Sequence, residues 1–272
     1  MSRLVIESGR SHREYWRDLW RYRELFYVLA WRDITVRYKQ TAIGVIWALL
    51  QPLLTMIIFT VLFGHVAKMP SDGMPYPLLV LAASLPWQFI SASLSSASQS
   101  LVGNSNLISK VYFPRLIIPA SAVVTATVDL LISFVLMAAM MVWYQDWPTW
   151  RIVFLPAFIL LAFLAALGPG LLITALNVQY RDFRYIIPFV IQLGFFISPV
   201  GYLSSTVPDK WRMLYSINPA VGVIDGFRWA LLGGHNTIDP RGFILSLVVT
   251  AVLLWVGIAY FRKMERTFAD VI

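Results

Sequence analysis

Lysine and histidine, which often hold phosphates and metal ions in proteins, are few and scattered in this chain. A P-loop needs a Gly-Lys-Ser/Thr sequence, in which backbone amides and one lysine hold the phosphates of a nucleotide. None of the five lysines follows a glycine, so we do not expect this chain to hydrolyse ATP by that route. The three histidines lack zinc-type spacing, and no Gly-x-Ser-x-Gly motif occurs. These absences disfavour an enzyme.

The overall composition indicates an integral membrane protein. Charged residues make up 13% of the 272 residues, about half of the roughly 25% typical of soluble proteins, and hydrophobic residues make up 58%. This balance excludes an ordinary soluble enzyme and a disordered chain. The net charge of +8 belongs to an apolar chain, which also excludes a nucleic-acid-binding module. Without cysteine, the chain has no disulfide, thiolate metal site or cysteine nucleophile.

Long runs without charged residues predict an all-α membrane fold, because a bilayer core needs about 20 apolar residues per helix. We predict a segment 1–40, a transmembrane domain 41–261 and a tail 262–272. The six predicted spans are about 41–63, 77–102, 116–144, 152–178, 185–203 and 242–261. A seventh span at 217–232 is rejected because it contains Asp225 and Arg228, and because an odd count would separate the two ends of the chain.

The distribution of basic residues predicts the orientation of these spans. Sixteen of the 22 Lys and Arg residues fall in the two ends of the chain and in the loops around 103–115 and 179–185. Cytoplasmic loops carry the positive excess in membrane proteins. We therefore expect both termini to be cytoplasmic.

One acid, Asp129, lies inside a predicted span. An intramembrane acid is a candidate proton or cation site. A lone acid makes a poor proton relay, however, and no second carboxylate or buried base is evident in the neighbouring spans. We favour a structural polar contact with Ser121, Thr125 or a residue of another helix.

Three further segments suggest specific structures. Within 1–40, the spacing of Tyr22, Leu25, Phe26 and Leu29 gives an apolar stripe flanked by basic residues, which predicts an amphipathic helix in the headgroup plane, or else a cap packed on a partner.

The segment 201–241 has two short apolar stretches punctuated by Pro and Gly, which predict two re-entrant or external helices rather than an irregular loop. The Ser/Ala-rich run 91–98 favours close helix packing, with a water-facing conduit as the alternative.

Four separated motifs, in the right order, resemble the permeases of type-2 ABC exporters of polysaccharides. The first is Arg32-Asp33-Ile34-Thr35-Val36-Arg37-Tyr38-Lys39-Gln40-Thr41, followed by Gly44, Trp47 and Gln51-Pro52-Leu53. The second is the loop from Asn104 to Arg115, and the third is Tyr180 to Tyr185 followed by Pro188-Phe189 and Ser198-Pro199-Val200. The fourth is Asn218-Pro219 with Gly226-Phe227-Arg228. The subgroup that the chain resembles most is that of O-antigen exporters.

This resemblance implies a homodimer of six-helix half-transporters in the bacterial inner membrane. Two separate ATPase subunits would bind ATP and Mg²⁺, and the chain itself would carry no cofactor. The substrate would be a polysaccharide linked to undecaprenyl diphosphate. Teichoic-acid and capsule exporters share much of the pattern, and an ABC exporter of a drug or small lipid is the next alternative. A secondary transporter or channel, and a membrane enzyme, lack the paired ionisable residues or clustered Asp, His and Arg that they would need.

The loop 103–115 is the predicted lever that couples the permease to the ATPase. It is apolar for an exposed turn, and we expect Asn104 or Ser105 to cap a short helix with an apolar edge that contacts a protein partner. The alternative is a turn that lies on the lipid headgroups. The predicted coupling residues are Asn104, Leu107, Ile108, Lys110, Val111, Tyr112, Arg181 and Asp182.

Aromatic side chains near the outer ends of the spans are the candidate translocation path. Ring faces contact the C–H surfaces of sugars without demanding one sugar sequence, which suits a polymer that must slide. For any single ring, lipid contact or core packing remains an alternative. The candidates are Phe59, Phe63, Trp87, Phe89, Phe195, Phe196 and Tyr202.

Overall fold

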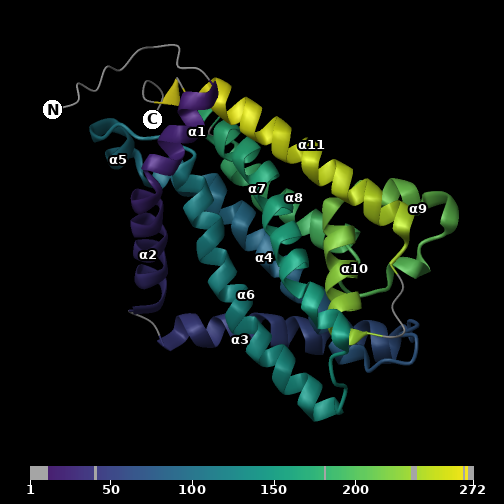
Figure 1. Cartoon of the computed structure of the whole chain (residues 1–272). Helices are drawn as coiled ribbons and strands as arrows, with labels where there is room; N and C mark the ends of the chain where they lie inside the picture. Colours follow the sequence, from purple (N-terminus) through teal and green to yellow (C-terminus); the bar gives the residue numbers. More distant parts are fainter. Residues whose placement is uncertain (1–11, 40–41, 181, 234–237, 266, 269–272) are drawn as a thin grey trace.

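The computed structural model describes residues 12–39, 42–180, 182–233, 238–265 and 267–268. This part of the chain is almost entirely helical, and Figure 1 shows the helices packed side by side as one bundle. The all-α prediction is therefore confirmed for the described residues. The predicted boundary at residues 40–41 lies outside them, as do residues 1–11 of the predicted N-terminal segment and residues 266 and 269–272 of the predicted tail.

Five helices among the described residues are long and apolar enough to cross a membrane. The first is α3 (Ala42–Phe59) with its π-helical extension η1 (Thr60–Val66), and the next two are α4 (Tyr76–Gly103) and α6 (Ile117–Tyr144). The last two are α7 (Leu155–Gln179), preceded by the 3-10 turn η2 (Trp150–Phe154), and α11 (Pro240–Met264). Each matches one predicted span to within a few residues, and most extend slightly beyond it.

The sixth predicted span, 185–203, differs from the structure. The helix there, α8 (Phe183–Ile197), has 15 residues and is too short to be counted with the other five. It ends where Ser198 adopts an extended backbone, because the ring of Pro199 disfavours helical geometry in the residue before it. The predicted end at residue 203 is wrong, and a sixth crossing stays a prediction.

The centre of the bundle is α4, which packs against α6, α7 and α10 (Pro219–Leu232). Outside this centre, α11 lies along α7 (Figure 1). A side chain at Gly168 would meet the backbone of Leu254 at 2.6 Å, and one at Gly257 would meet the carbonyl oxygen of Gly168 at 2.1 Å. These two glycines therefore allow α7 and α11 to touch backbone to backbone, as small residues do in membrane bundles.

The N-terminal helices α1 (His12–Arg21) and α2 (Arg23–Lys39) lie at the same end of the molecule as α5 (Ser105–Lys110) and the last turns of α11 (Figure 1). Here a group of apolar residues forms what we call the end cluster. Its buried members are Leu29, Leu101, Ile108, Phe113, Leu116, Ile117, Ile118, Ala120, Leu171, Ala175, Val178, Phe261 and Phe268. The described part of both chain ends thus meets at one end of the bundle, as the distribution of basic residues predicts.

The predicted amphipathic stripe of Tyr22, Leu25, Phe26 and Leu29 packs against this end cluster. The apolar face of this stripe is therefore covered by the chain's own bundle. The prediction that this face lies on lipid is wrong. The exposed side of α1 and α2 instead carries aromatic rings: Trp16, Trp20, Tyr27 and Trp31. Whether these helices lie in the headgroup plane stays a prediction.

Two short helices, α9 (Asp209–Tyr215) and α10, follow α8 and the 3-10 turn η3 (Ser204–Thr206), as the sequence predicts. They lie at the end of the molecule opposite to α5 (Figure 1). The second is not an external segment, because α10 packs against α4, α7 and α11 and is among the most buried elements. Asn218 caps it, its side-chain oxygen accepting a hydrogen bond from the Ala220 N–H at 3.0 Å.

Candidate coupling surface and translocation path

The short helix α5 presents a different face from the predicted one. Ile108 is 6% exposed and belongs to the end cluster, and Leu107 packs against that cluster. Val111 and Tyr112, which directly follow the helix, are 51% and 48% exposed, and Lys110 is exposed beside them. The predicted exposed edge of Leu107, Ile108 and Val111 is therefore wrong for Leu107 and Ile108, whereas Val111 is exposed. The surface available to a partner runs from Ser109 to Tyr112, which we call the α5 surface.

Asn104 joins α5 to the N-terminal helices. Its side chain makes no capping hydrogen bond to α5, contrary to the predicted role. Its side-chain oxygen instead accepts a hydrogen bond of 2.9 Å from the guanidinium of Arg32, which also pairs with Asp33 at 2.7 Å. The amide of Asn104 donates to the carbonyl of Ser100. The sequence motif that begins at Arg32 therefore holds the loop that begins at Asn104 in place.

Glu265 fixes the other side of this loop. The backbone N–H of Arg115 donates to the Glu265 carboxylate at 2.7 Å, and the Arg115 guanidinium donates to the Glu265 carbonyl. Burial raises the pKa of Glu265, and the hydrogen bond from Arg115 opposes this shift. The guanidinium of Arg262 lies 4.6 Å from the ring centroid of Tyr15. The segment after α5 is thus anchored to the end of α11, and α11 in turn contacts α1.

Of the two coupling residues predicted between α7 and α8, Asp182 is exposed directly before α8, and Arg181 lies outside the described residues. The preceding Gln179 is held by Tyr260 of α11, whose hydroxyl is 3.2 Å from the Gln179 side-chain oxygen. Val178 belongs to the same end cluster as Ile108. Both predicted cytoplasmic loops therefore lie at one end of the bundle.

Five of the seven predicted path aromatics form one connected cluster. Phe59 contacts Phe63 and Phe195, each with ring centroids 5.2 Å apart. Phe195 also contacts Trp87 at 6.0 Å and Phe196 at 5.6 Å. We call these five rings the aromatic cluster. It joins α3, η1, α4 and α8, and Phe196 is its most exposed member at 62%.

Two glycines let the aromatic cluster pack this closely. A side chain at Gly194 would meet the Trp87 ring at 2.7 Å, and one at Gly201 would meet the Phe59 ring at 2.4 Å. The two remaining predicted aromatics lie elsewhere. Phe89 is buried in the core, and the Tyr202 hydroxyl is 3.0 Å from that of Tyr215 in the outer loop.

Asp129 makes the structural contact that the sequence favours, and its partners are the residues of another helix rather than Ser121 or Thr125. Its carboxylate pairs with the Arg37 guanidinium at 2.6 Å and accepts a hydrogen bond from the Tyr38 hydroxyl. Ser121 and Thr125, the predicted partners, hydrogen-bond to backbone carbonyls of α6 itself. The intramembrane acid therefore fastens the end of α2 to α6.

The Ser/Ala-rich run serves two surfaces of α4. On one side, the carbonyls of Ala97 and Ser98 accept hydrogen bonds from Thr174 and Asn177 of α7, at 2.8 and 2.7 Å. On another, Ser91 and Ser95 line a cavity of about 450 Å³ between α3, α4, α6 and α8, together with polar side chains of the neighbouring helices. We call this the polar cavity. Close packing is thus confirmed for one face of the run, another face lines a cavity, and a water-facing conduit stays a prediction.

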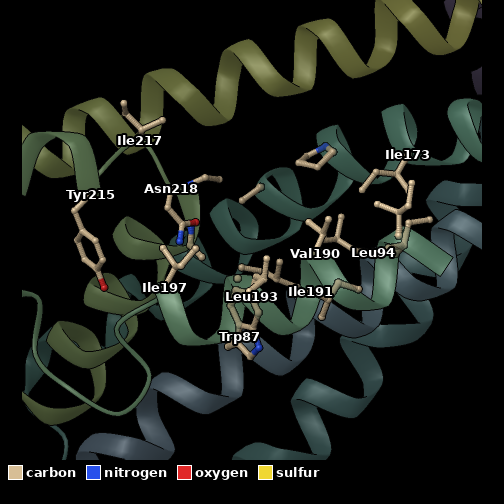
Figure 2. A pocket seen from close by; sticks show the side chains of 18 of the residues that line it. Trp87, Leu94, Ile173, Val190, Ile191, Leu193, Ile197, Tyr215, Ile217 and Asn218 are labelled. Atoms are coloured by element: carbon tan, nitrogen blue, oxygen red, sulfur yellow. The ribbon is translucent and has the colours of Figure 1, made fainter. Parts of the chain in front are cut away.

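A larger apolar cavity of about 830 Å³ lies beside α8. Its lining comes from α4, α7, α8, α9 and α10, and it extends from Phe183 to Ile197 along the whole of α8. Most residues around it are aliphatic, and Figure 2 labels three that are not, Trp87, Tyr215 and Asn218. Along this side, α8 faces open space rather than a close-packed neighbour.

Arg228 is a structural anchor that sequence reasoning missed. Its side chain is 1% exposed and donates hydrogen bonds to the carbonyl oxygens of Leu79, Val200 and Tyr202, at 3.2, 3.2 and 2.9 Å. It thereby joins α4, α10 and the loop after α8. An arginine in an otherwise apolar stretch is the signal for such an anchor, because a buried guanidinium must have partners.

Comparison with known proteins finds similarity along most of the chain. Residues 24–232 match the family described as ABC-2 type transporter. The O-antigen export system permease protein RfbA of Myxococcus xanthus is 30% identical over 256 residues, which cover 93% of this chain and 97% of that protein. An O-antigen export system permease protein RfbA of Klebsiella pneumoniae is 27% identical, covering 92% and 95%. The polysialic acid transport protein KpsM of Escherichia coli is 22% identical, covering 86% and 91%.

The family match covers most of the chain, and the relatives align nearly end to end. The helical bundle and its apolar spans agree with this assignment. The chain belongs to the ABC-2 type transporter family.

Proposed function

We propose that this protein is the permease subunit of an ATP-driven exporter that moves lipid-linked polysaccharide across the bacterial inner membrane. Two copies form the membrane part, and two separate ATPase subunits bind to its cytoplasmic end. The substrate is O-antigen carried on undecaprenyl diphosphate. Both termini of the permease are cytoplasmic.

The observation that carries this proposal is the end-to-end similarity to a permease named for O-antigen export, which covers 93% of this chain and 97% of that relative. The similarity includes both candidate coupling loops and the helices of the aromatic cluster. A second O-antigen export permease aligns over nearly the same length.

Two structural features support the proposal. The α5 surface is exposed and the segment after α5 is anchored to the end of α11, as a contact for a separate motor must be if it is to transmit movement. The polar cavity and the aromatic cluster are built from the same helices α3, α4 and α8, and together they offer hydrogen-bonding groups and ring faces to a glycan. No lysine follows a glycine in the sequence, so the motor belongs to another chain.

Export of a capsule polysaccharide is the second candidate, because the polysialic acid transport protein also aligns over most of this chain. Teichoic acid, or a drug or small lipid, would be further substrates of the same architecture. These candidates differ in which molecule accumulates inside the cell when the permease is absent.

Deletion of the gene in its source bacterium tests the proposal. We expect lipid-linked polysaccharide to accumulate in the inner membrane and O-antigen to disappear from the surface, with both restored by the wild-type gene. Loss of a capsule with intact O-antigen would select the second candidate. An unchanged set of surface polysaccharides would refute export of polysaccharide altogether.

A further inference from the structure

The polar cavity is unusual for its place in the molecule, because it lies among helices that are otherwise apolar. Its volume of about 450 Å³ is within the range of ligand pockets, and it far exceeds the space of about 30 Å³ that one water molecule takes in the liquid. A polar cavity of this size inside a membrane bundle holds water or a polar ligand. Part of its polar lining comes from the Ser/Ala-rich run of α4, on the face of that run that does not pack against α7.

The hydrogen-bonding groups of the cavity come from three helices. Gln88, Ser91 and Ser95 follow one another along one face of α4, at a spacing of three and four residues. Gln51 of α3 and Ser133 of α6 complete the polar lining. The amide nitrogen of Gln88 is buried and has no hydrogen-bond partner among the described residues. An unpaired buried amide is costly, and Gln88 lines the cavity, so its side chain gains a hydrogen bond by turning this amide toward a ligand or water there.

The charges around the cavity are already paired. The carboxylate of Asp129 is bound by Arg37 and Tyr38, so it does not offer a free negative site to a cation. Among the described residues, no group of three His, Cys, Asp or Glu side chains could hold a metal ion. The groups left for a ligand are neutral amides and hydroxyls. They suit a neutral polyhydroxyl compound better than an ion or a phosphate.

The apolar part of the lining also suits a sugar. Trp47 and Phe89 contribute aromatic rings to the cavity wall, beside Leu85, Leu130 and Ile191. A sugar ring has an apolar C–H face and a rim of hydroxyls, and therefore needs both kinds of wall.

The cavity and the aromatic cluster follow each other along the same helices. Gln51 precedes Phe59 on α3 by about two helical turns, or about 12 Å of rise. On α4, Gln88 directly follows Trp87, and on α8, Ile191 precedes Phe195 by about one turn. The cavity is thus adjacent to the cluster and is displaced from it toward the N-terminal part of α3.

We propose that the polar cavity is a sugar-binding subsite, in which the amides of Gln88 and Gln51 hydrogen-bond the hydroxyls of the glycan before it reaches the aromatic cluster. This inference rests on the proposed function and deepens it. It assigns recognition of the glycan to neutral amides in the bundle, separately from any recognition of the lipid carrier.

A cysteine-protection experiment tests the subsite in the complete complex. The chain has no cysteine, so Ser91→Cys introduces a single thiol into the cavity. The permease is reconstituted with its ATPase without ATP and treated with a small water-soluble thiol reagent. We expect lipid-linked polysaccharide extracted from the source bacterium to slow the labelling several-fold, and undecaprenyl phosphate alone to leave it unchanged. Ser205→Cys, at an exposed position outside both the polar cavity and the α5 surface, is the control and should label equally with and without polysaccharide.

A matched pair of substitutions gives a second readout. Gln88→Leu removes the amide at nearly constant size and should lower polysaccharide export about tenfold, the effect of losing one buried hydrogen bond. Gln99→Leu makes the same change at an exposed position of α4 outside the cavity, and should export normally.

The outcomes separate this inference from the proposed function. If the wild-type complex exports polysaccharide but Gln88→Leu exports equally and polysaccharide does not protect the cavity thiol, the subsite is refuted alone. Protection by undecaprenyl phosphate would show a lipid-carrier site and would also refute it. If the wild-type complex exports no polysaccharide, the proposed function itself fails.

Discussion

At the scale of single residues, the contact of Asp129 with Arg37 and Tyr38 holds the N-terminal helix α2 to the membrane bundle. A carboxylate inside a span is costly unless it is paired, and here both of its oxygens have partners. The Arg37 side chain is 43% exposed, so solvent weakens the pair relative to a fully buried one.

From this contact we predict that the effect of Asp129 on stability and export depends on its ion pair with Arg37. Asp129→Asn removes the ion pair with Arg37 and should destabilise the protein by about 1 kcal/mol, at the upper end of the values for exposed pairs. Arg37→Gln combined with Asp129→Asn should recover both thermal stability and export. Loss of export that the double substitution does not recover, in a stably folded protein, would point to a proton or cation role for Asp129.

For Arg228 we predict a larger loss of stability than for Asp129. Arg228→Met removes the donor that three backbone carbonyls share and leaves Asp225 nearby without its counter-charge. The loss should be about 3–5 kcal/mol, as for one partner of a buried charged pair, and should appear as a large drop in melting temperature in detergent. Arg241→Met, at an exposed outer position, serves as the control. Equal melting temperatures for the two variants would contradict the anchoring role.

At the scale of elements, α5 is fixed from both sides while the residues after it are exposed. We predict that Val111→Asp weakens binding of the ATPase at least tenfold without changing thermal stability, because an unpaired charge enters the contact and the side chain has no role in the core. Pull-down of the ATPase by the purified permease measures this.

Two controls accompany the α5 prediction. Thr206→Asp adds the same charge at an exposed position at the opposite end of the molecule and should bind the ATPase normally. Ile108→Asp should instead destabilise the permease, because Ile108 is buried in the end cluster. Normal ATPase binding and export by Val111→Asp would place the coupling contact elsewhere, with the segment before α8 as the next candidate.

The long spans could be predicted from the sequence because length and hydropathy alone determine them. Whether the apolar face of a short amphipathic segment points into the bundle or away from it could not be predicted from the sequence. The stripe from Tyr22 to Leu29 and the edge at Leu107 and Ile108 were both expected to face away from the bundle. An apolar face shows that something covers it, but not whether that is lipid, a partner or the chain itself.

The aromatic cluster and the polar cavity illustrate the same limit. Five of the seven candidate aromatics meet, because the ends of α3 and α8 lie against the middle of α4 at Trp87. Phe89 is only two residues from Trp87, but it points into the core because neighbouring positions of a helix face different directions. The contribution of Gln51 and Gln88 depends on how α3 and α4 pack, which no local pattern encodes.

At the scale of the whole molecule, the described parts of both chain ends and α5 lie at one end of the bundle, with α9 at the other. We predict that a cysteine at Ser205 reacts with a membrane-impermeant thiol reagent added to intact cells, and that one at Ser109 reacts only after the cells are opened. Both positions are exposed, so burial does not explain a difference. The reverse pattern would overturn the orientation.

The central claim is that this chain is the passive membrane path of a polysaccharide exporter driven by a separate ATPase. Its most direct test is transport of radiolabelled lipid-linked polysaccharide into inside-out vesicles that contain the purified permease. We expect uptake only when both the partner ATPase and ATP are present, and none with the permease alone. Uptake by the permease without the ATPase, or none by the complete complex when the same complex moves a small lipid or drug, would contradict the account.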